Sequence, residues 1–158
     1  MKACGLIVEY NPFHNGHKYH LLKAQEITKC DLTIACMSGN YLQRGEPALL
    51  NKWLRAEMAV ENGVDLVVEL PSFYSNESAE IFALGAIKIL DYLKADSICF
   101  GSEAGEVESL QNIVDFSERK EFSEKIKQLL KDGISYPNAM RILIEEEFGE
   151  NSLNPNNI

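Results

Sequence analysis

Two histidines, His14 and His17, lie on either side of Gly16, between an apolar run, Ala3–Val8, and a helical pattern over residues 18–29. A helix that begins just after a strand presents unpaired N–H groups and the positive end of its dipole, and both favour phosphate. Imidazoles donate hydrogen bonds to phosphate oxygens near neutral pH. The segment therefore predicts a nucleotide-handling site.

The residues around the two histidines support this interpretation. Pro12 restricts the turn, and Gly16 allows a ligand or the backbone to approach closely. The alternative is a pair of surface imidazoles, one of which caps the helix. His20 adds a third imidazole, but three histidines on one and a half helical turns seldom enclose one ion, so we interpret His20 as a neighbour and predict no metal site.

A long loop after the second apolar run contains one arginine, Arg44, and leads to Lys52 and Arg55 on the next predicted helix. Loops of this length in a small domain often carry function. The Arg44 guanidinium could bind a phosphate or a carboxylate. It could equally form a surface ion pair with Glu46 or Glu57.

Two other positions are candidates for ligand contacts. Lys18 could bind phosphate or be a solvated helix lysine. Gly101 ends the fourth apolar run and would let a nucleotide lie against the backbone, with Ser102 or Glu103 bonding the ribose hydroxyls. The alternative role for Ser102 is a helix N-cap with Glu106 nearby.

The 158 residues suffice for one domain, and 46% hydrophobic with 25% charged residues is typical of a globular protein. No apolar run is long enough to span a bilayer, and Glu9 and Asn11 interrupt the only N-terminal run that could belong to a signal peptide. We expect free thiols and a cytoplasmic protein, because no metal-type spacing relates the cysteines Cys4, Cys30, Cys36 and Cys99.

The net charge of −9 is unevenly distributed. Residues 1–60 hold seven Lys and Arg against five Asp and Glu, and the acidic excess lies in the rest of the chain. The part with the histidines thus suits an anionic ligand. An acidic chain is a poor nucleic-acid surface by itself, so any RNA substrate would need basic surface from elsewhere.

Short apolar runs alternate with segments of helical spacing, which predicts βαβ units. The runs lack a polar alternation, as expected for parallel strands covered on both faces. Right-handed crossovers give an α/β fold, a three-layer sandwich with a Rossmann-like parallel sheet. The predicted strands are 3–8, 32–37, 64–70 and 97–100, and the predicted helices between them are 16–29, 51–62 and 76–93.

The third of these helices should face the core with Ile81, Leu84, Ile87, Ile89, Leu90 and Leu93. Beyond the fourth strand the pattern is helical only, over 107–116, 122–131 and 138–148. We therefore expect a nucleotide-binding domain, residues 1–105, and a helical extension, residues 106–158, that stops before a last sheet element. Ligands bind beyond the carboxyl ends of parallel strands, where residues 9–17, 38–47 and 101–105 should converge.

His14-Asn15-Gly16-His17 resembles the His-x-Gly-His signature of the nucleotidyltransferase superfamily. The resemblance extends over residues 2–17, 37–40, 43–48, 100–103 and 154–158, which together are similar to the bacterial tRNA(Met) cytidine acetate ligase family. Family members are much longer, and their later part is expected to supply a further basic signature for the triphosphate and most of the tRNA surface.

The resemblance implies an enzyme that condenses acetate with ATP to acetyl-adenylate and then acetylates N4 of the wobble cytidine of elongator tRNA(Met). His14 and His17 would be catalytic and stabilise charge on the α-phosphate, and Mg²⁺ would accompany ATP. By the same resemblance ATP contacts Ile7, Val8, Glu9, Tyr10, Asn11, Pro12, Phe13, His14, Asn15, Gly16, His17, Lys18, Tyr19, His20, Gly101 and Asn156 or Asn157.

Two alternatives stay open. A small-molecule adenylyltransferase of the same superfamily would use the same histidines, although the 43–48 loop and the helical ending argue against it. An inactive ATP-binding fragment would fit the acidic surface and the abrupt ending.

Overall fold

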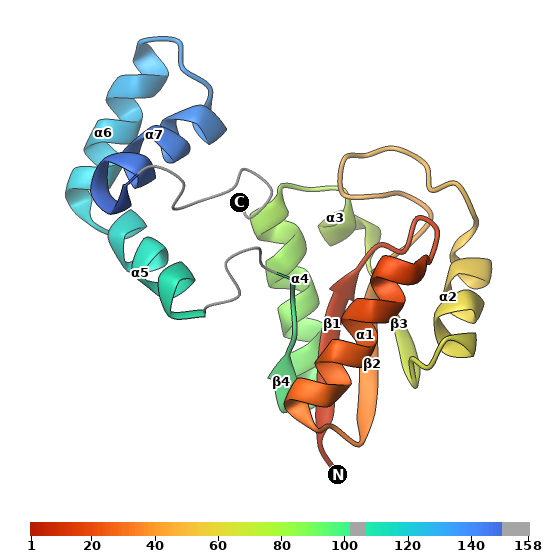
Figure 1. Ribbon diagram of the computed structural model, residues 1–158. Coiled ribbons are helices and arrows are strands. Elements are labelled where there is room, and N and C mark those ends of the chain that lie inside the picture. Colours follow the sequence, from red (N-terminus) through yellow and green to blue (C-terminus); the bar gives the residue numbers. More distant parts are fainter. Residues whose placement is uncertain (102–106, 150–158) are drawn as a thin grey trace. The chain divides into compact units, whose positions relative to one another are not determined.

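A computed structural model describes residues 1–101 and 107–149 of the chain, which divides into two units, residues 1–100 and 101–158 (Figure 1). None of the helices in the described ranges is long and apolar enough to cross a membrane. The first unit contains β1 (Ala3–Val8), α1 (Asn15–Thr28), β2 (Leu32–Ser38), α2 (Lys52–Glu61), β3 (Leu66–Leu70), α3 (Ser72–Ser75), α4 (Ala79–Tyr92) and β4 (Ser97–Ile98).

The sheet has four parallel strands in the order β3-β2-β1-β4. The register places Val8 of β1 opposite Met37 of β2, and Gly5 opposite Ile98 of β4. The predicted α/β fold with a parallel sheet is confirmed. Two strands are shorter than predicted, since β3 begins at Leu66 and β4 has only two residues.

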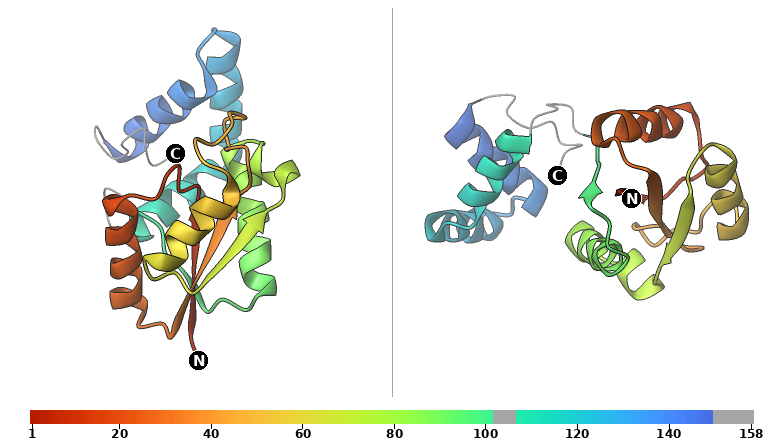
Figure 2. Two further views of the ribbon diagram at one scale, coloured as in Figure 1. Left: turned by 90° about the vertical axis from the view of Figure 1, so that its right-hand side faces the viewer. Right: turned by 90° about the horizontal axis from the view of Figure 1, so that it is seen from below.

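Helices cover both faces of this sheet, which confirms the three-layer arrangement (Figure 2). On one face α1 and α2 bury Leu21, Ala24 and Ala59 against Leu6 and Met37. On the other face α4 contributes a second cluster that contains Ala86 and Leu90.

The predicted core stripe of α4 is only partly correct. Leu90 is fully buried, and Ile89 and Leu93 pack against the second cluster. The side chains of Ile81, Leu84 and Ile87 are 39%, 46% and 44% exposed. The helix contacts the sheet along a face that contains Ala86 and Leu90, and Ile81, Leu84 and Ile87 form a neighbouring stripe at three-residue spacing. The single-turn helix α3 was not predicted, because four residues are too few to show a helical spacing of apolar side chains.

The described part of the second unit contains three helices, α5 (Val107–Ser117), α6 (Lys120–Lys131) and α7 (Tyr136–Phe148). They bury a separate cluster formed by Phe116, Phe122, Ile126, Ala139 and Leu143.

The strand order fixes where a ligand of the first unit should bind. From β1 the chain moves to β2 and β3 on one side, and it then returns to β4 on the other side of β1. In open α/β sheets ligands occupy the crevice at such a reversal of strand order, beyond the carboxyl ends of the strands. The histidine segment follows β1 at this edge.

Candidate functional site

The first turn of α1 is capped by two imidazoles. Nδ1 of His14, the N-cap residue, accepts a hydrogen bond from the Gly16 backbone N–H at 3.1 Å. Nδ1 of His17 accepts one from the His14 backbone N–H at 3.3 Å. The arrangement is a capping box in which imidazoles replace the usual hydroxyl and carboxylate. Because each Nδ1 is an acceptor, the hydrogen of each neutral ring lies on Nε2.

The two rings also stack, with centroids 3.7 Å apart and planes 23° apart. Behind them Tyr10 contacts His17 edge-on at a centroid distance of 4.9 Å, and Phe13 lies 5.7 Å from the same ring. Both aromatic side chains are buried, Tyr10 at 1% exposure. The His17 ring is therefore fixed on two sides by packing and at Nδ1 by a hydrogen bond.

Gly16 is required by this arrangement. A Cβ at that position would lie 2.9 Å from Cε1 of His14, closer than real Cβ atoms approach. Any larger residue would push the His14 ring away from its capping position.

The electrostatics of the site favour the neutral form of His17 and His20. Burial lowers the pKa of His17, and the nearby His14 and His20 lower it further. Burial also lowers the pKa of His20, while the nearby Cys99 backbone acts in the opposite direction. Neutral rings at the positive end of α1 remain hydrogen-bond donors without carrying full charges.

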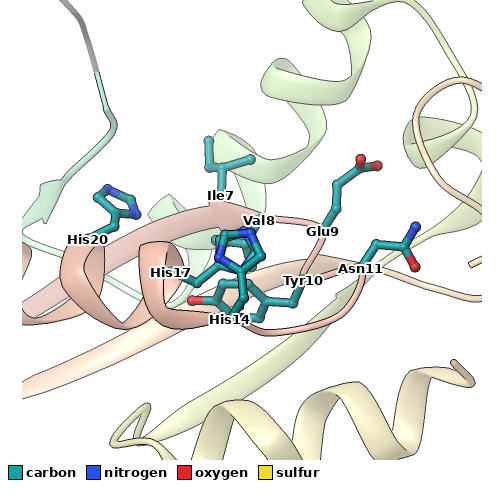
Figure 3. A pocket seen from close by; sticks show the side chains of 8 residues that line it. All are labelled: Ile7, Val8, Glu9, Tyr10, Asn11, His14, His17 and His20. Atoms are coloured by element: carbon teal, nitrogen blue, oxygen red, sulfur yellow. The ribbon is translucent and has the colours of Figure 1, made fainter. Parts of the chain in front are cut away.

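These groups border a pocket of about 430 Å³ (Figure 3). Two buried polar atoms in its lining residues, Oη of Tyr10 and Nε2 of His20, have no hydrogen-bond partner among the described residues. Burial raises the pKa of Tyr10 to about 12, so its hydroxyl stays protonated. The pocket is lined by Ile7, Val8, Glu9, Tyr10, Asn11, His14, His17 and His20.

Two residues of the pocket wall hold the loop that follows β2. Oε1 of Glu9 accepts a hydrogen bond from the Gln43 backbone N–H at 2.7 Å, and Oδ1 of Asn11 accepts one from the Leu49 backbone N–H at 2.8 Å. Both acceptor atoms thus bind the backbone of residues 39–50. We call this segment the anchored loop. Its attachment at two points makes the loop part of the site's framework.

The structure brings together most of the predicted ATP contacts. Pro12, Phe13, Asn15 and Gly16 belong to the same turn and helix start without lining the pocket, and Lys18 and Tyr19 are exposed on α1. Ser102, Glu103, Glu106, Asn156 and Asn157 lie outside the described residues.

Arg44 and Gly101 are both exposed. Among the described residues Arg44 forms no ion pair, so the expected alternative partners, Glu46 and Glu57, do not hold it. A Cβ at Gly101 would meet nothing within 4 Å. The ligand contacts of both residues stay predictions.

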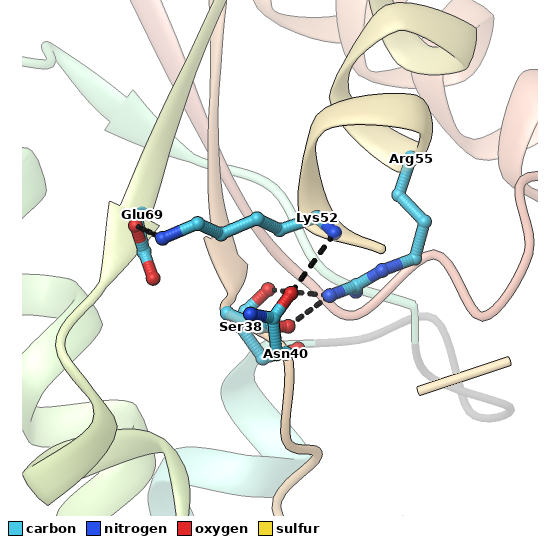
Figure 4. Close-up of polar contacts among 6 residues, drawn as sticks. Ser38, Asn40, Lys52, Arg55 and Glu69 are labelled. Carbon is cyan, nitrogen blue, oxygen red and sulfur yellow. Dashed lines mark hydrogen bonds and ion pairs between the residues drawn. The ribbon is translucent and has the colours of Figure 1, made fainter. Parts of the chain in front are cut away.

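Sequence reasoning missed one residue near this edge, Arg55 of α2 (Figure 4). It is fully buried, and within the described part of the chain it donates its hydrogen bonds to backbone carbonyls. Lys52, on the same helix, instead pairs with Glu69 at 2.6 Å. The sequence does contain one indication of this burial. Arg55 and Ala59 are four residues apart and so share one helix face, the face that α2 buries.

Within residues 1–101 and 107–149, no group of three or more His, Cys, Asp or Glu side chains is arranged to hold a metal ion.

Comparisons with known proteins show what the chain is similar to. A family model described as HIGH Nucleotidyl Transferase matches residues 1–158. A tRNA(Met) cytidine acetate ligase of Caldicellulosiruptor saccharolyticus is 52% identical over 161 residues, which cover 100% of this chain and 40% of that protein. The Clostridium tetani protein of the same name is 49% identical, again over 100% of this chain and 40% of the relative. The chain thus spans about 40% of the length of these relatives.

Two solved structures are similar to the chain. Thermotoga maritima TmcAL bound with alpha-thio ATP superposes with a TM-score of 0.84 at 43% identity, over 99% of this chain and 39% of that one. The apo form of the same protein gives 0.85 at 43% identity, over 99% and 38%.

Proposed function

The chain belongs to the HIGH nucleotidyl transferase family, and from this premise we propose that it binds ATP and activates acetate as part of a tRNA(Met) cytidine acetate ligase. The stacked pair of His14 and His17 carries the proposal. Two imidazoles fixed at a helix N-terminus, each with Nε2–H available, form a rigid donor pair for phosphate oxygens. The names of relatives at 52% and 49% identity support the choice of reaction.

In the proposed first step a carboxylate oxygen of acetate attacks the α-phosphorus of ATP. The bond from that phosphorus to the bridging oxygen toward the β-phosphate breaks, and pyrophosphate leaves with the electron pair. The product is acetyl-adenylate. The imidazoles would stabilise the negative charge that builds on the phosphate oxygens, without forming a covalent intermediate.

In the proposed second step N4 of the wobble cytidine of elongator tRNA(Met) attacks the acetyl carbonyl carbon. AMP leaves, the nitrogen loses a proton, and an amide bond forms. The first 60 residues, with seven Lys and Arg against five Asp and Glu, provide little basic surface for RNA. We propose that other parts of the ligase hold the tRNA, and that the enzyme acts in the cytoplasm.

We assign ATP binding to residues 7–20, and we keep Gly101, Asn156, Asn157 and Arg44 as proposed contacts. Mg²⁺ bound together with ATP would neutralise charge on the leaving pyrophosphate. We propose residues 1–105 as the nucleotide-binding domain and residues 106–158 as its helical extension.

The test is isotope exchange between pyrophosphate and ATP, measured with and without acetate. Exchange that depends on acetate, together with its loss in His17→Ala, would support the proposed activation step. Exchange that requires a different acceptor would favour a small-molecule adenylyltransferase. ATP binding without any exchange would favour a nucleotide-binding part that is not catalytic alone.

A further inference from the structure

We infer that Arg55 is a positioning residue for the proposed ATP site, a role that rests on the proposed function. Its guanidinium ties the exit of β1 to the anchored loop and so fixes the pocket wall. Arg55 itself does not line the pocket.

The guanidinium connects three chain segments. Nη1 donates to the carbonyl of Glu9, just past β1. Nη2 donates to the carbonyl of Ser38, the last residue of β2, at 3.0 Å, and also to that of Gly39. Nε donates to the carbonyl of Leu50, just before α2, at 3.1 Å. A planar fork of donors can span four acceptors in this way, whereas an ammonium group cannot.

These acceptors need partners because of where they lie. The β1–β2 ladder ends at the pair Val8 and Met37, so the Glu9 and Gly39 carbonyls fall beyond it. Buried carbonyls without partners are costly, and Arg55 satisfies them.

Glu9 transmits the effect to the pocket. Its carbonyl is held by Arg55, its carboxylate holds Gln43 of the anchored loop, and the residue lines the pocket directly before Tyr10. Asn11 holds the same loop at Leu49. Loss of the Arg55 bonds should therefore loosen the anchored loop and the β1 exit together.

No carboxylate among the described residues forms an ion pair with Arg55. Burial lowers the pKa of the Arg55 guanidinium, and the negative charges of Glu9 and Glu69 act in the opposite direction. Its positive charge adds to that of the helix terminus. Both charges favour an anionic ligand, and substitution can separate the charge of Arg55 from the hydrogen bonds that its guanidinium donates.

The experiment compares Arg55→Lys, which keeps the charge, with Arg55→Gln, which removes it. The matched control is Lys52→Gln, which removes a charge from the same helix without touching the carbonyls. Amide hydrogen exchange and ATP affinity are measured for each variant of this chain. In Arg55→Lys we expect the amides of Gln43 and Leu49 to exchange at least tenfold faster and ATP to bind at least tenfold more weakly. In Lys52→Gln both should stay within twofold.

Exchange of the buried Leu21 and Ala24 amides of α1 reports on the whole unit. If these amides lose as much protection as the loop, Arg55 is a general stability residue and the inference is wrong. Loop exchange and ATP affinity within twofold of the unsubstituted chain would also overturn it. If the unsubstituted chain does not bind ATP, the proposed function fails, while the loop amides still decide whether Arg55 holds the anchored loop.

Should both Arg55 variants fail to fold, the unsubstituted chain provides a second measurement. The side-chain N–H signals of Arg55 should exchange slowly with water and should shift when ATP is added. Fast exchange, or signals unmoved by saturating ATP, would refute the inference.

Discussion

The imidazole rings of His14 and His17 stack at a centroid distance of 3.7 Å, while each Nδ1 is occupied by a backbone N–H. Two unit charges about 4 Å apart repel by about 1 kcal/mol in bulk water and by about 4 kcal/mol near a protein surface. The stack is therefore compatible with neutral rings and opposed to a doubly protonated pair. A bound phosphate group would change this balance by attracting a proton onto the pair.

The first prediction concerns the pH dependence of stability. The pKa of His17 is lowered in the folded chain, mainly by burial, and that of His20 is lowered as well. The unfolded chain therefore binds protons at higher pH than the folded chain does. Stability should be fully retained above the ordinary value of 6.5 and should fall as the pH drops through and below it.

Urea unfolding at pH 7.5 and pH 5.5 measures this loss. His17→Asn should retain more of its pH 7.5 stability at pH 5.5 than the unsubstituted chain does. An NMR titration should place the midpoint of His17 below 6.5 without ATP and move it upward with ATP. A midpoint above 6.5 in the free protein would contradict the neutral stack.

The second prediction concerns Gly16→Ala. Alanine is the better helix former by about 1 kcal/mol, but its Cβ would displace the His14 ring, and loss of an N-cap costs about 0.5–2 kcal/mol. Because the two effects oppose each other, stability should change by no more than about 1 kcal/mol. ATP affinity should nevertheless fall more than tenfold, as measured by calorimetry. Unchanged affinity would mean that the stacked pair does not contact the nucleotide.

The third prediction concerns Tyr10→Phe. The Tyr10 hydroxyl is buried without a hydrogen-bond partner among the described residues. Removing an unpaired buried polar group while keeping the ring should raise the free energy of unfolding, by about 1 kcal/mol. Tyr10→Ala should lower it by about 3–5 kcal/mol, because the ring that packs against Phe13 and His17 is lost. A destabilised Tyr10→Phe would reveal a partner of the hydroxyl.

The sheet could be predicted because its signal is local. Runs such as Ala3–Val8 are apolar throughout, since both faces of β1 are covered, and the intervening helices show their own period. The edge of the sheet was harder to predict. The sequence does not show that β4 stops at Ile98, nor that Ile81, Leu84 and Ile87 of α4 are partly exposed.

The position of the candidate site followed from the order of strand, turn and helix, but its internal geometry did not. The imidazole capping box depends on how the chain turns between β1 and α1, where Tyr10 has a φ of 48°. The sequence analysis names Arg55 only as a residue of the helix that follows the loop, and it does not predict the burial of this side chain. Its burial depends on carbonyls of residues 9, 38 and 39, which are far away in sequence.

The last prediction separates the phosphate end of the pocket from its nucleoside end. His20 lies three residues beyond His17 on α1, about 4.5 Å further along the helix axis. A triphosphate held at His14 and His17 would leave the adenosine to occupy the remainder of the pocket, where Nε2 of His20 is buried without a hydrogen-bond partner among the described residues. A ribose hydroxyl or the adenine amino group would supply the missing partner.

His20→Ala should therefore weaken ATP binding by about five- to tenfold, the value of one hydrogen bond of about 1–1.5 kcal/mol, and leave the binding of inorganic tripolyphosphate unchanged. His17→Ala should weaken both ligands, because both present the same phosphates to the helix terminus. Competition calorimetry with the two ligands measures both effects on each variant. If His20→Ala weakened the binding of ATP and of tripolyphosphate equally, the His20 imidazole would contact the phosphate groups instead. The nucleoside would then have to lie on the other side of the His14–His17 pair.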